Sequence, residues 1–349
     1  MSRAVVEPAT RDRGRGAPPT PVAQWPGWRR WLGAIAGTTL VIWFFSEVFF
    51  VNVGDFFYGW SLREGVAQVL LGTAEAVGVW LLFYAFFVLW LLAAVVFFRV
   101  RSAWALAFAA AICGWAIEGS AIPIMYQEMP IALLWPAASW HVLVNVFVGW
   151  WLLPRVIETQ PLGVVVGVFA ALGAVWSLWA TWFWPVGGGG SLAEHSLPLP
   201  PSDFAFVALI GGLLLTAGYT LLDRFGWGAP PPRPRALAAF VVVGALLTVL
   251  GSQFHAAIFF ALVGVAGVFL WRNRVDETRP SLLAAPRGRS PTTNLVAVMA
   301  MPAVAAALYP LWYRLGVGVN AHVDLVVGAI NVAAVALFAV AGTKLLARR

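Results

Sequence analysis

The chain has 349 residues, of which 61% are hydrophobic and only 11% are charged, and its mean hydropathy is +0.83. A water-soluble domain is usually about 45–50% apolar and about 25% charged, so this composition excludes a soluble enzyme. Several apolar stretches exceed the roughly 20 residues that a helix needs to cross about 30 Å of hydrocarbon. The sequence therefore predicts an all-α polytopic membrane protein.

The net charge of +7 does not indicate a nucleic-acid partner, because the basic residues lie between the apolar stretches rather than in one patch. The partner that this arrangement predicts is the lipid bilayer. The single cysteine, Cys113, excludes an intrachain disulfide and a cysteine-based metal motif. The 20 tryptophans are typical of side chains that anchor spans at a membrane interface.

Ten apolar stretches are candidate spans, which makes the expected fold a bundle of about ten transmembrane helices. They lie near residues 32–52, 68–98, 103–123, 131–153, 162–184, 203–222, 236–252, 254–271, 294–313 and 322–346. The second stretch is too long for an upright helix and is expected to tilt or to begin at the interface. The pair between residues 236 and 271 is compatible with a hairpin that spans twice or with a re-entrant pair.

The expected organisation has a tail and two membrane parts. Residues 1–30 are rich in Pro, Gly and Arg and are predicted to form a disordered basic tail in the cytoplasm. Residues 31–160 would form a four-helix part that carries the polar site, and residues 161–349 a six-helix part. Pro- and Arg-rich segments at 226–235 and 272–293 are predicted to be mobile cytoplasmic linkers.

The basic residues predict the orientation. If the N-terminus is cytoplasmic and the chain crosses at every stretch, all of the 22 Lys and Arg residues except Arg63 and Arg314 fall on the cytoplasmic side. This asymmetry matches the positive-inside rule. Both termini are therefore expected in the cytoplasm of a prokaryotic cell, with the protein in the plasma (inner) membrane.

Four ionisable residues inside the first four stretches are the main functional signal. Glu47, Glu75, Glu118 and His141 come from consecutive stretches, and Asn145 follows His141 by one helical turn. At a rise of 1.5 Å per residue, the four ionisable groups lie within roughly 10 Å of depth on the outer side. Intramembrane ionisable groups are costly, and helices joined by short loops are usually neighbours. The four groups are therefore expected to converge.

Three carboxylates and an imidazole suit three kinds of chemistry. They could hold a divalent ion such as zinc, manganese or iron, relay protons, or act as an acid–base pair on a lipid-soluble substrate. All four are predicted as catalytic groups and as metal ligands. His195, in an outer loop that could close as a lid, is the fifth predicted ligand, and the predicted substrate-binding residues are Asn145, Trp115 and Trp140.

Structural roles remain open for the same residues, because a glutamate near a helix end can reach the interface and an Asn or His can join helices. The sequence contains no HExxH, GxSxG, phosphate-binding loop or dinucleotide-binding motif. The leading hypothesis is a membrane-embedded enzyme, with or without a divalent metal ion, that acts on a lipid or isoprenoid-like substrate. The alternatives are a proton- or cation-coupled transporter and a non-catalytic membrane subunit. The off-centre cluster and the absence of a recognisable internal repeat favour the enzyme.

The charge asymmetry predicts the result of reporter fusions. Reporters placed after Arg101, Arg155 and Arg289 should be active as cytoplasmic fusions, and reporters in 187–190 as external ones. A paired phosphatase and fluorescent-protein series measures both sides. A cytoplasmic signal from the 187–190 fusion would contradict the alternation of sides.

Overall fold

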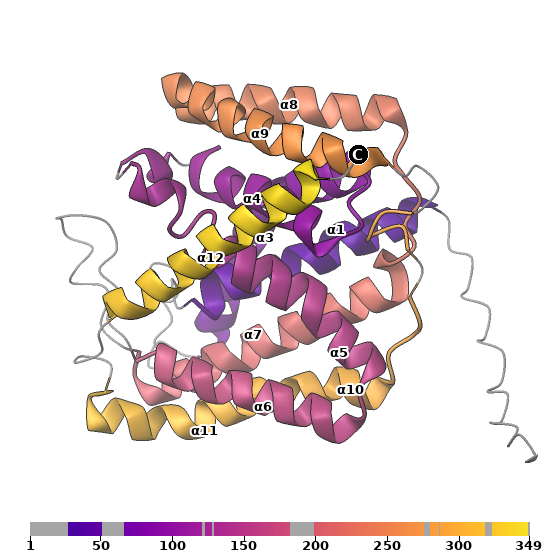
Figure 1. Ribbon diagram of the computed structural model, residues 1–349. Helices are drawn as coiled ribbons and strands as arrows, with labels where there is room; N and C mark the ends of the chain where they lie inside the picture. Colours follow the sequence, from indigo (N-terminus) through magenta and orange to yellow (C-terminus); the bar gives the residue numbers. More distant parts are fainter. Residues whose placement is uncertain are drawn as a thin grey trace, which may run out of the picture.

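A computed structural model describes residues 27–50, 66–120, 123–127, 129–181, 199–275, 280–285, 287–317 and 323–347. Within these ranges all regular structure is helical, as the composition predicts (Figure 1). Eight of the described helices are long and apolar enough to cross a membrane. The chain is therefore a multi-pass helical membrane protein.

The N-terminal half supplies the elements around the polar residues. They are α1 (Gly27–Trp43), η1 (Phe44–Val48), α3 (Val66–Phe97), α4 (Ala103–Gly119), η3 (Ile124–Tyr126), η4 (Ile131–Leu133), η5 (His141–Leu152) and α5 (Leu153–Thr159). The C-terminal half supplies the helices that pack around these elements. Its elements are α6 (Leu162–Trp179), α7 (Pro201–Leu221), η7 (Leu222–Gly226), α8 (Pro234–Ser252), η8 (Gln253–His255), α9 (Ala256–Arg272), η9 (Asn273–Val275), α10 (Thr292–Val296), η10 (Ala297–Met299), α11 (Ala300–Leu315) and α12 (Val323–Leu346).

The pair of stretches expected between residues 236 and 271 forms two helices, α8 and α9. The apolar run Pro234–Arg272 divides at Gln253, whose φ of 49° lies in the left-handed region that a non-glycine residue seldom adopts. Helices α8 and α9 then lie side by side (Figure 1). At 1.5 Å per residue each is about 25–28 Å long, close to the thickness of the hydrocarbon core.

The expected span at 131–153 is wrong at its start. The chain forms only the short η4 and a series of turns before the long helix begins at His141, and that helix continues through α5 to Thr159. Pro130 and Pro136 explain the difference, because proline lacks an N–H donor and disfavours helical geometry in the residue before it. His141 consequently lies at the first turn of its helix instead of about ten residues inside it.

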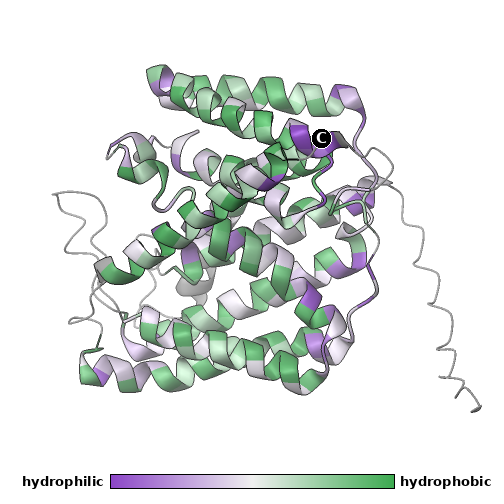
Figure 2. Ribbon diagram, viewed as in Figure 1, coloured by the Kyte–Doolittle hydropathy of each residue, from purple (hydrophilic) through white to green (hydrophobic). Residues whose placement is uncertain are grey.

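The helices differ strongly in how much protein covers them. In the first span, Gly27–Val48, 78% of the residues in the most apolar window are buried, whereas the fraction is 22% in Pro234–Arg272 and 17% in Leu325–Leu346. The poorly covered helices are apolar along their lengths (Figure 2). An uncovered apolar helix is stable where lipid surrounds it. We therefore infer that the uncovered faces of α8, α9 and α12 contact lipid, whereas α1 lies in the centre of the bundle.

Small residues allow α1 to pack closely against α7 and η7. A Cβ atom added at Gly37 would lie 2.8 Å from the carbonyl oxygen of Gly218, and one at Gly33 would overlap the Cβ atom of Phe225. These separations are too short for any side chain. The pairing uses the same close backbone approach that small residues provide in other membrane helix pairs.

The two segments expected to be mobile linkers are partly bound to the helices. Arg30 Nη1 donates to Trp227 O at 2.9 Å, and Gly228 N–H donates to Leu283 O at 2.9 Å. The guanidinium of Arg287 lies 3.8 Å from the centroid of the Trp227 ring, a cation–π contact. The described parts of 226–235 and 272–293 therefore form a layer across the helix ends that the charges assign to the cytoplasm.

Acidic groups at the helix ends complete this layer. The carboxylate of Glu158 accepts from Gly288 N–H at 2.8 Å, and that of Asp223 accepts from Ser290 N–H at 2.8 Å. Burial, followed by the positive charge of Arg155, lowers the pKa of Arg287 to about 10. The carboxylates of Glu158 and Asp223 oppose this decrease in pKa. Because a pKa of about 10 is still well above 7, the Arg287 guanidinium is charged at neutral pH and keeps its cation–π contact with Trp227.

The turns before η5 pack tightly on α4 at Gly114. A Cβ atom there would overlap the carbonyl oxygen of Ala137 and lie 3.1 Å from the Cβ atom of His141. We expect Gly114→Ala to lower the free energy of unfolding by about 1–3 kcal/mol, because overpacking forces the backbone to move. Unfolding in mixed micelles of increasing SDS fraction measures the change.

Gly167 is the matched control, since a Cβ atom at that helical position meets nothing within 4 Å. Gly167→Ala should leave the stability unchanged or raise it by up to about 1 kcal/mol through helix propensity. Equal stabilities for the two variants would show that the segment before η5 is not held against α4 as described.

Candidate functional site

Two of the polar residues lie on an unusual turn at the end of α1. The helix widens into the π-helix η1, in which Phe49 N–H donates to Phe44 O, five residues back, at 2.8 Å. Ser46 and Glu47 lie in this segment and are only 3% and 6% exposed. Single π-helical turns inside α-helices are rare and occur frequently at functional sites.

Glu118 lies one residue before the end of α4. Ser102 caps the start of this helix, because its hydroxyl accepts from Ala105 N–H at 3.2 Å, and the helix ends at Gly119. A carboxylate at a helix C-terminus faces the negative end of the helix dipole and needs a compensating donor. The donor is His141, whose Nε2 lies 2.8 Å from Glu118 Oε1, and both side chains are mostly covered, with exposed fractions of 4% and 13%.

His141 and Asn145 lie one turn apart on η5 and face η1. His141 Nδ1 is 3.2 Å from Ser46 Oγ and 2.7 Å from Asn145 Nδ2. Asn145 Nδ2 also donates to Ser46 Oγ. The imidazole therefore touches a carboxylate with one ring nitrogen and a serine hydroxyl with the other.

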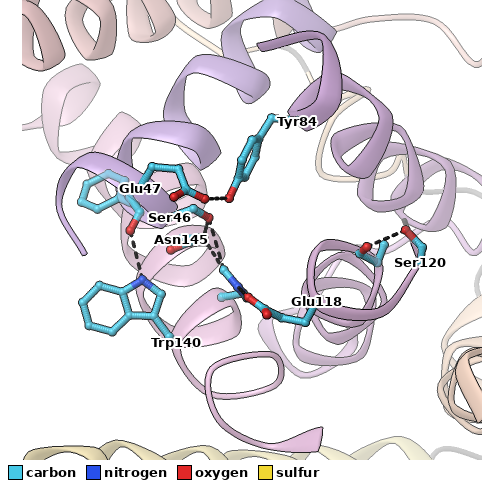
Figure 3. A network of polar contacts seen from close by, with 10 residues as sticks. Ser46, Glu47, Tyr84, Glu118, Ser120, Trp140 and Asn145 are labelled. Atoms are coloured by element: carbon cyan, nitrogen blue, oxygen red, sulfur yellow. Dashed lines mark hydrogen bonds and ion pairs between the residues drawn. The ribbon is translucent and has the colours of Figure 1, made fainter. Parts of the chain in front are cut away.

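Tyr84 holds the remaining carboxylate beside this group. Its hydroxyl donates to Glu47 Oε1, and Glu47 follows Ser46 directly in η1. Figure 3 shows Tyr84 and Glu47 pointing toward one another, with Ser46 and Asn145 beside them. Polar contacts thus run from Glu118 through His141 to Ser46, and a separate contact joins Tyr84 to Glu47, so that together they connect α4, η5, η1 and α3. We call these five residues together with Asn145 the polar chain.

The two tryptophans predicted to bind substrate are held by backbone contacts. Trp140 Nε1 donates to Phe45 O at 3.0 Å, and its ring stacks on Trp179 with centroids 5.0 Å apart. Trp115 Nε1 donates to Leu133 O at 3.0 Å. Both indole N–H groups are thus used to position the segments around the polar chain, and a role for either ring against a substrate stays a prediction.

The structure brings together three of the four predicted ionisable residues. Glu118 and His141 are in direct contact, and Glu47 lies beside them because it follows Ser46, which contacts His141, in η1. The side chain of Glu75 and the whole of His195 lie outside the described residues. Among the described residues, no group of three or more His, Cys, Asp or Glu side chains is arranged to hold a metal ion.

Sequence reasoning missed Ser46 and Tyr84, which contact the predicted residues. Ser46 could have been found from its place beside Glu47 in the apolar run WFFSEVFF, where it is the only other polar side chain. Tyr84 gave no such signal, because it lies nine positions after Glu75 in a uniformly apolar stretch. Its role depends on which face of α3 meets η1.

No known family model, curated protein or solved structure matches the chain. The functional argument consequently depends on the geometry of the polar chain.

The contact between Tyr84 and Glu47 predicts a stability effect. Tyr84→Phe removes the donor from a carboxylate that is only 6% exposed, and we expect the free energy of unfolding to fall by about 1–3 kcal/mol. Tyr313→Phe, at a tyrosine that is 40% exposed, is the control and should change it by less than about 0.5 kcal/mol. SDS titration in mixed micelles compares them, and equal stabilities would mean that Glu47 does not depend on Tyr84.

Proposed function

We propose that this multi-pass membrane protein is a membrane-embedded enzyme that performs acid–base chemistry on a lipid-soluble substrate. The single observation that carries the proposal is the position of His141, whose Nε2 lies 2.8 Å from Glu118 and whose Nδ1 lies 3.2 Å from Ser46. An imidazole held by a carboxylate on one side and facing a hydroxyl on the other is the usual arrangement of a general base.

The surroundings support a substrate that is itself lipid-soluble. The polar chain lies among fully buried apolar side chains, including Phe45 and Phe87, and Glu118 is its most exposed carboxylate at 13%. An apolar enclosure excludes water and favours a hydrocarbon-rich substrate such as a lipid or an isoprenoid-like molecule. The charge asymmetry of the sequence places this chemistry toward the outer leaflet of a prokaryotic plasma membrane.

A second candidate is proton-coupled transport, and one observation favours it. Beside Ser46, the contact between Tyr84 and Glu47 adds a second hydrogen-bonded carboxylate, so the polar chain holds two carboxylates on different helices close to one imidazole. Connected carboxyl, imidazole and hydroxyl groups inside a membrane are typical of proton relays. An acid–base enzyme needs only the part of the chain between Glu118 and Ser46.

Lipid conversion by reconstituted protein tests the proposal. Wild-type protein and His141→Gln are placed in vesicles made from a bacterial polar-lipid extract, and lipid products are quantified by mass spectrometry. Glutamine keeps hydrogen-bonding capacity but cannot accept and release the proton, so conversion should fall at least about 100-fold. His255→Gln is the matched control, because His255 is exposed and its ring stacks on Tyr126, which is not a residue of the polar chain.

The same vesicles distinguish the alternatives. Conversion that persists in His141→Gln, or no conversion by the wild type, contradicts the enzyme. Proton uptake by the wild type without lipid conversion, abolished by both His141→Gln and Tyr84→Phe, supports transport instead. If the wild type and all variants show neither lipid conversion nor proton uptake, the result supports the remaining alternative, a non-catalytic subunit.

A further inference from the structure

Ser46 occupies the position of a nucleophile in the polar chain. Its Oγ lies 3.2 Å from His141 Nδ1, and the other ring nitrogen lies 2.8 Å from the Glu118 carboxylate. A hydroxyl, a base within hydrogen-bond reach and a carboxylate that orients the base form the arrangement that activates serine in unrelated folds. We propose that Ser46 is a covalent nucleophile that accepts an acyl group from a long-chain carboxylic ester, an inference that rests on the proposed acid–base function.

The hydrogen-bond directions support this role. The carboxylate of Glu118 only accepts, so the hydrogen on the imidazole lies on Nε2 and leaves a lone pair on Nδ1. Asn145 Nδ2 donates to Ser46 Oγ and also lies 2.7 Å from Nδ1, so the amide and the serine hydroxyl both face the ring nitrogen that accepts. In the usual triad the carboxylate contacts Nδ1 and the serine hydroxyl faces Nε2, and here the two nitrogens are exchanged. The nitrogen that faces the hydroxyl still accepts its proton, and the nitrogen that faces the carboxylate still donates.

The backbone supplies an independent observation. Ser46 lies in the π-helix η1, and His141 and Asn145 lie in the π-helix η5. Two π-helical segments from distant parts of the sequence meet at the Ser46–His141 contact. π-helical turns cost stability relative to α-helix and persist frequently where a site needs the altered side-chain direction. A purely structural serine on an apolar helix needs no such turn, since it can donate to a carbonyl of its own helix.

Ser177 shows that alternative within the same protein. It is fully buried in α6, its hydroxyl donates to Ala174 O at 2.7 Å, three residues back, and it accepts from Trp312 Nε1 at 3.1 Å. Ser46 instead faces an imidazole on another helix. The comparison separates a serine whose hydroxyl hydrogen is used within its own helix from one whose hydroxyl faces a base.

The environment indicates the class of acyl donor. Ser46 is 3% exposed and is flanked by Phe44 and Phe45, which are fully buried, so a donor that reaches it must replace apolar contacts. A long hydrocarbon chain does so at little cost, whereas a water-soluble ester loses its hydration. Exclusion of water also protects an acyl intermediate from hydrolysis and favours transfer to a second alcohol.

The step balances without a further reactant. Ser46 Oγ attacks the ester carbonyl carbon while its proton moves to His141 Nδ1, and a C–O bond forms. The bond between the carbonyl carbon and the leaving alkoxide then breaks, and the alkoxide takes the proton from Nδ1. The product is an O-acyl serine and a free alcohol. A second alcohol reverses the sequence, releases a new ester and returns the proton to Ser46.

An activity-independent probe tests the nucleophile directly. Vesicles containing the full-length protein are treated with a long-chain alkyl fluorophosphonate, and the modified residue is mapped by peptide mass spectrometry on the wild type itself. We expect the adduct on Ser46, formed at least about 100-fold more slowly in His141→Gln, because the base is lost. Ser46→Ala should abolish it, and Ser177→Ala, the matched control, should leave its rate unchanged.

A long-chain p-nitrophenyl ester in the same vesicles gives a second measurement. A burst of p-nitrophenolate equal to the amount of protein, with the acyl group recovered on Ser46, supports the inference. Absence of an adduct on wild-type Ser46, or labelling at the same rate in His141→Gln, overturns it. Lipid conversion that survives in Ser46→Ala but fails in His141→Gln overturns the nucleophile alone, whereas conversion that survives in both overturns the proposed function as well.

Discussion

The contact between His141 and Glu118 is the interaction on which the interior of this protein depends. A carboxylate at the C-terminal end of an apolar helix is opposed both by desolvation and by the helix dipole, so it must find a donor within the protein. His141 provides that donor at 2.8 Å. To do so, the turns before η5 must approach the backbone of α4, which is possible because Gly114 has no side chain at the point of closest approach.

Once His141 is fixed by Glu118, the rest of the polar chain follows from geometry. The second ring nitrogen points to η1, where the π-helical turn presents Ser46, and Asn145 one turn later contacts the same hydroxyl. Buried polar networks are stable only when their members are satisfied, and a partly satisfied network costs more than an apolar core. Hydrogen bonding among these buried groups therefore favours a fold in which four segments of the chain meet around one small polar region.

The outside of the bundle obeys a different constraint. Helices α8, α9 and α12 have few buried residues and apolar faces, which is the arrangement expected where hydrocarbon replaces water as the solvent. At the helix ends assigned to the cytoplasm, Arg287, Glu158 and Asp223 bind the linker backbone and the Trp227 ring. Among the described residues, the buried Glu and His side chains, Glu47 and His141, both lie in the polar chain.

The sequence by itself determined the class of the protein. Composition and the length of the apolar stretches are sufficient for a helical multi-pass protein, because crossing hydrocarbon leaves the backbone few other solutions. The sequence also singled out Glu47, Glu118 and His141. Placing an ionisable side chain in an apolar span costs so much free energy that each such residue is by itself a candidate for function. It misplaced the start of the fourth helix, where Pro130 and Pro136 prevent the helix that hydropathy alone suggests.

Only the tertiary structure decided which of these groups meet and through what. The π-helical turns at η1 and η5 leave no periodic signature in a uniformly apolar sequence, yet they set the directions of Ser46 and His141. Tyr84 acquires its partner from the face that α3 presents to η1, and a helix that is apolar on all sides does not encode that face by periodicity. Packing between helices, which is cooperative and non-local, therefore determined the order of the polar chain from Glu118 to Glu47.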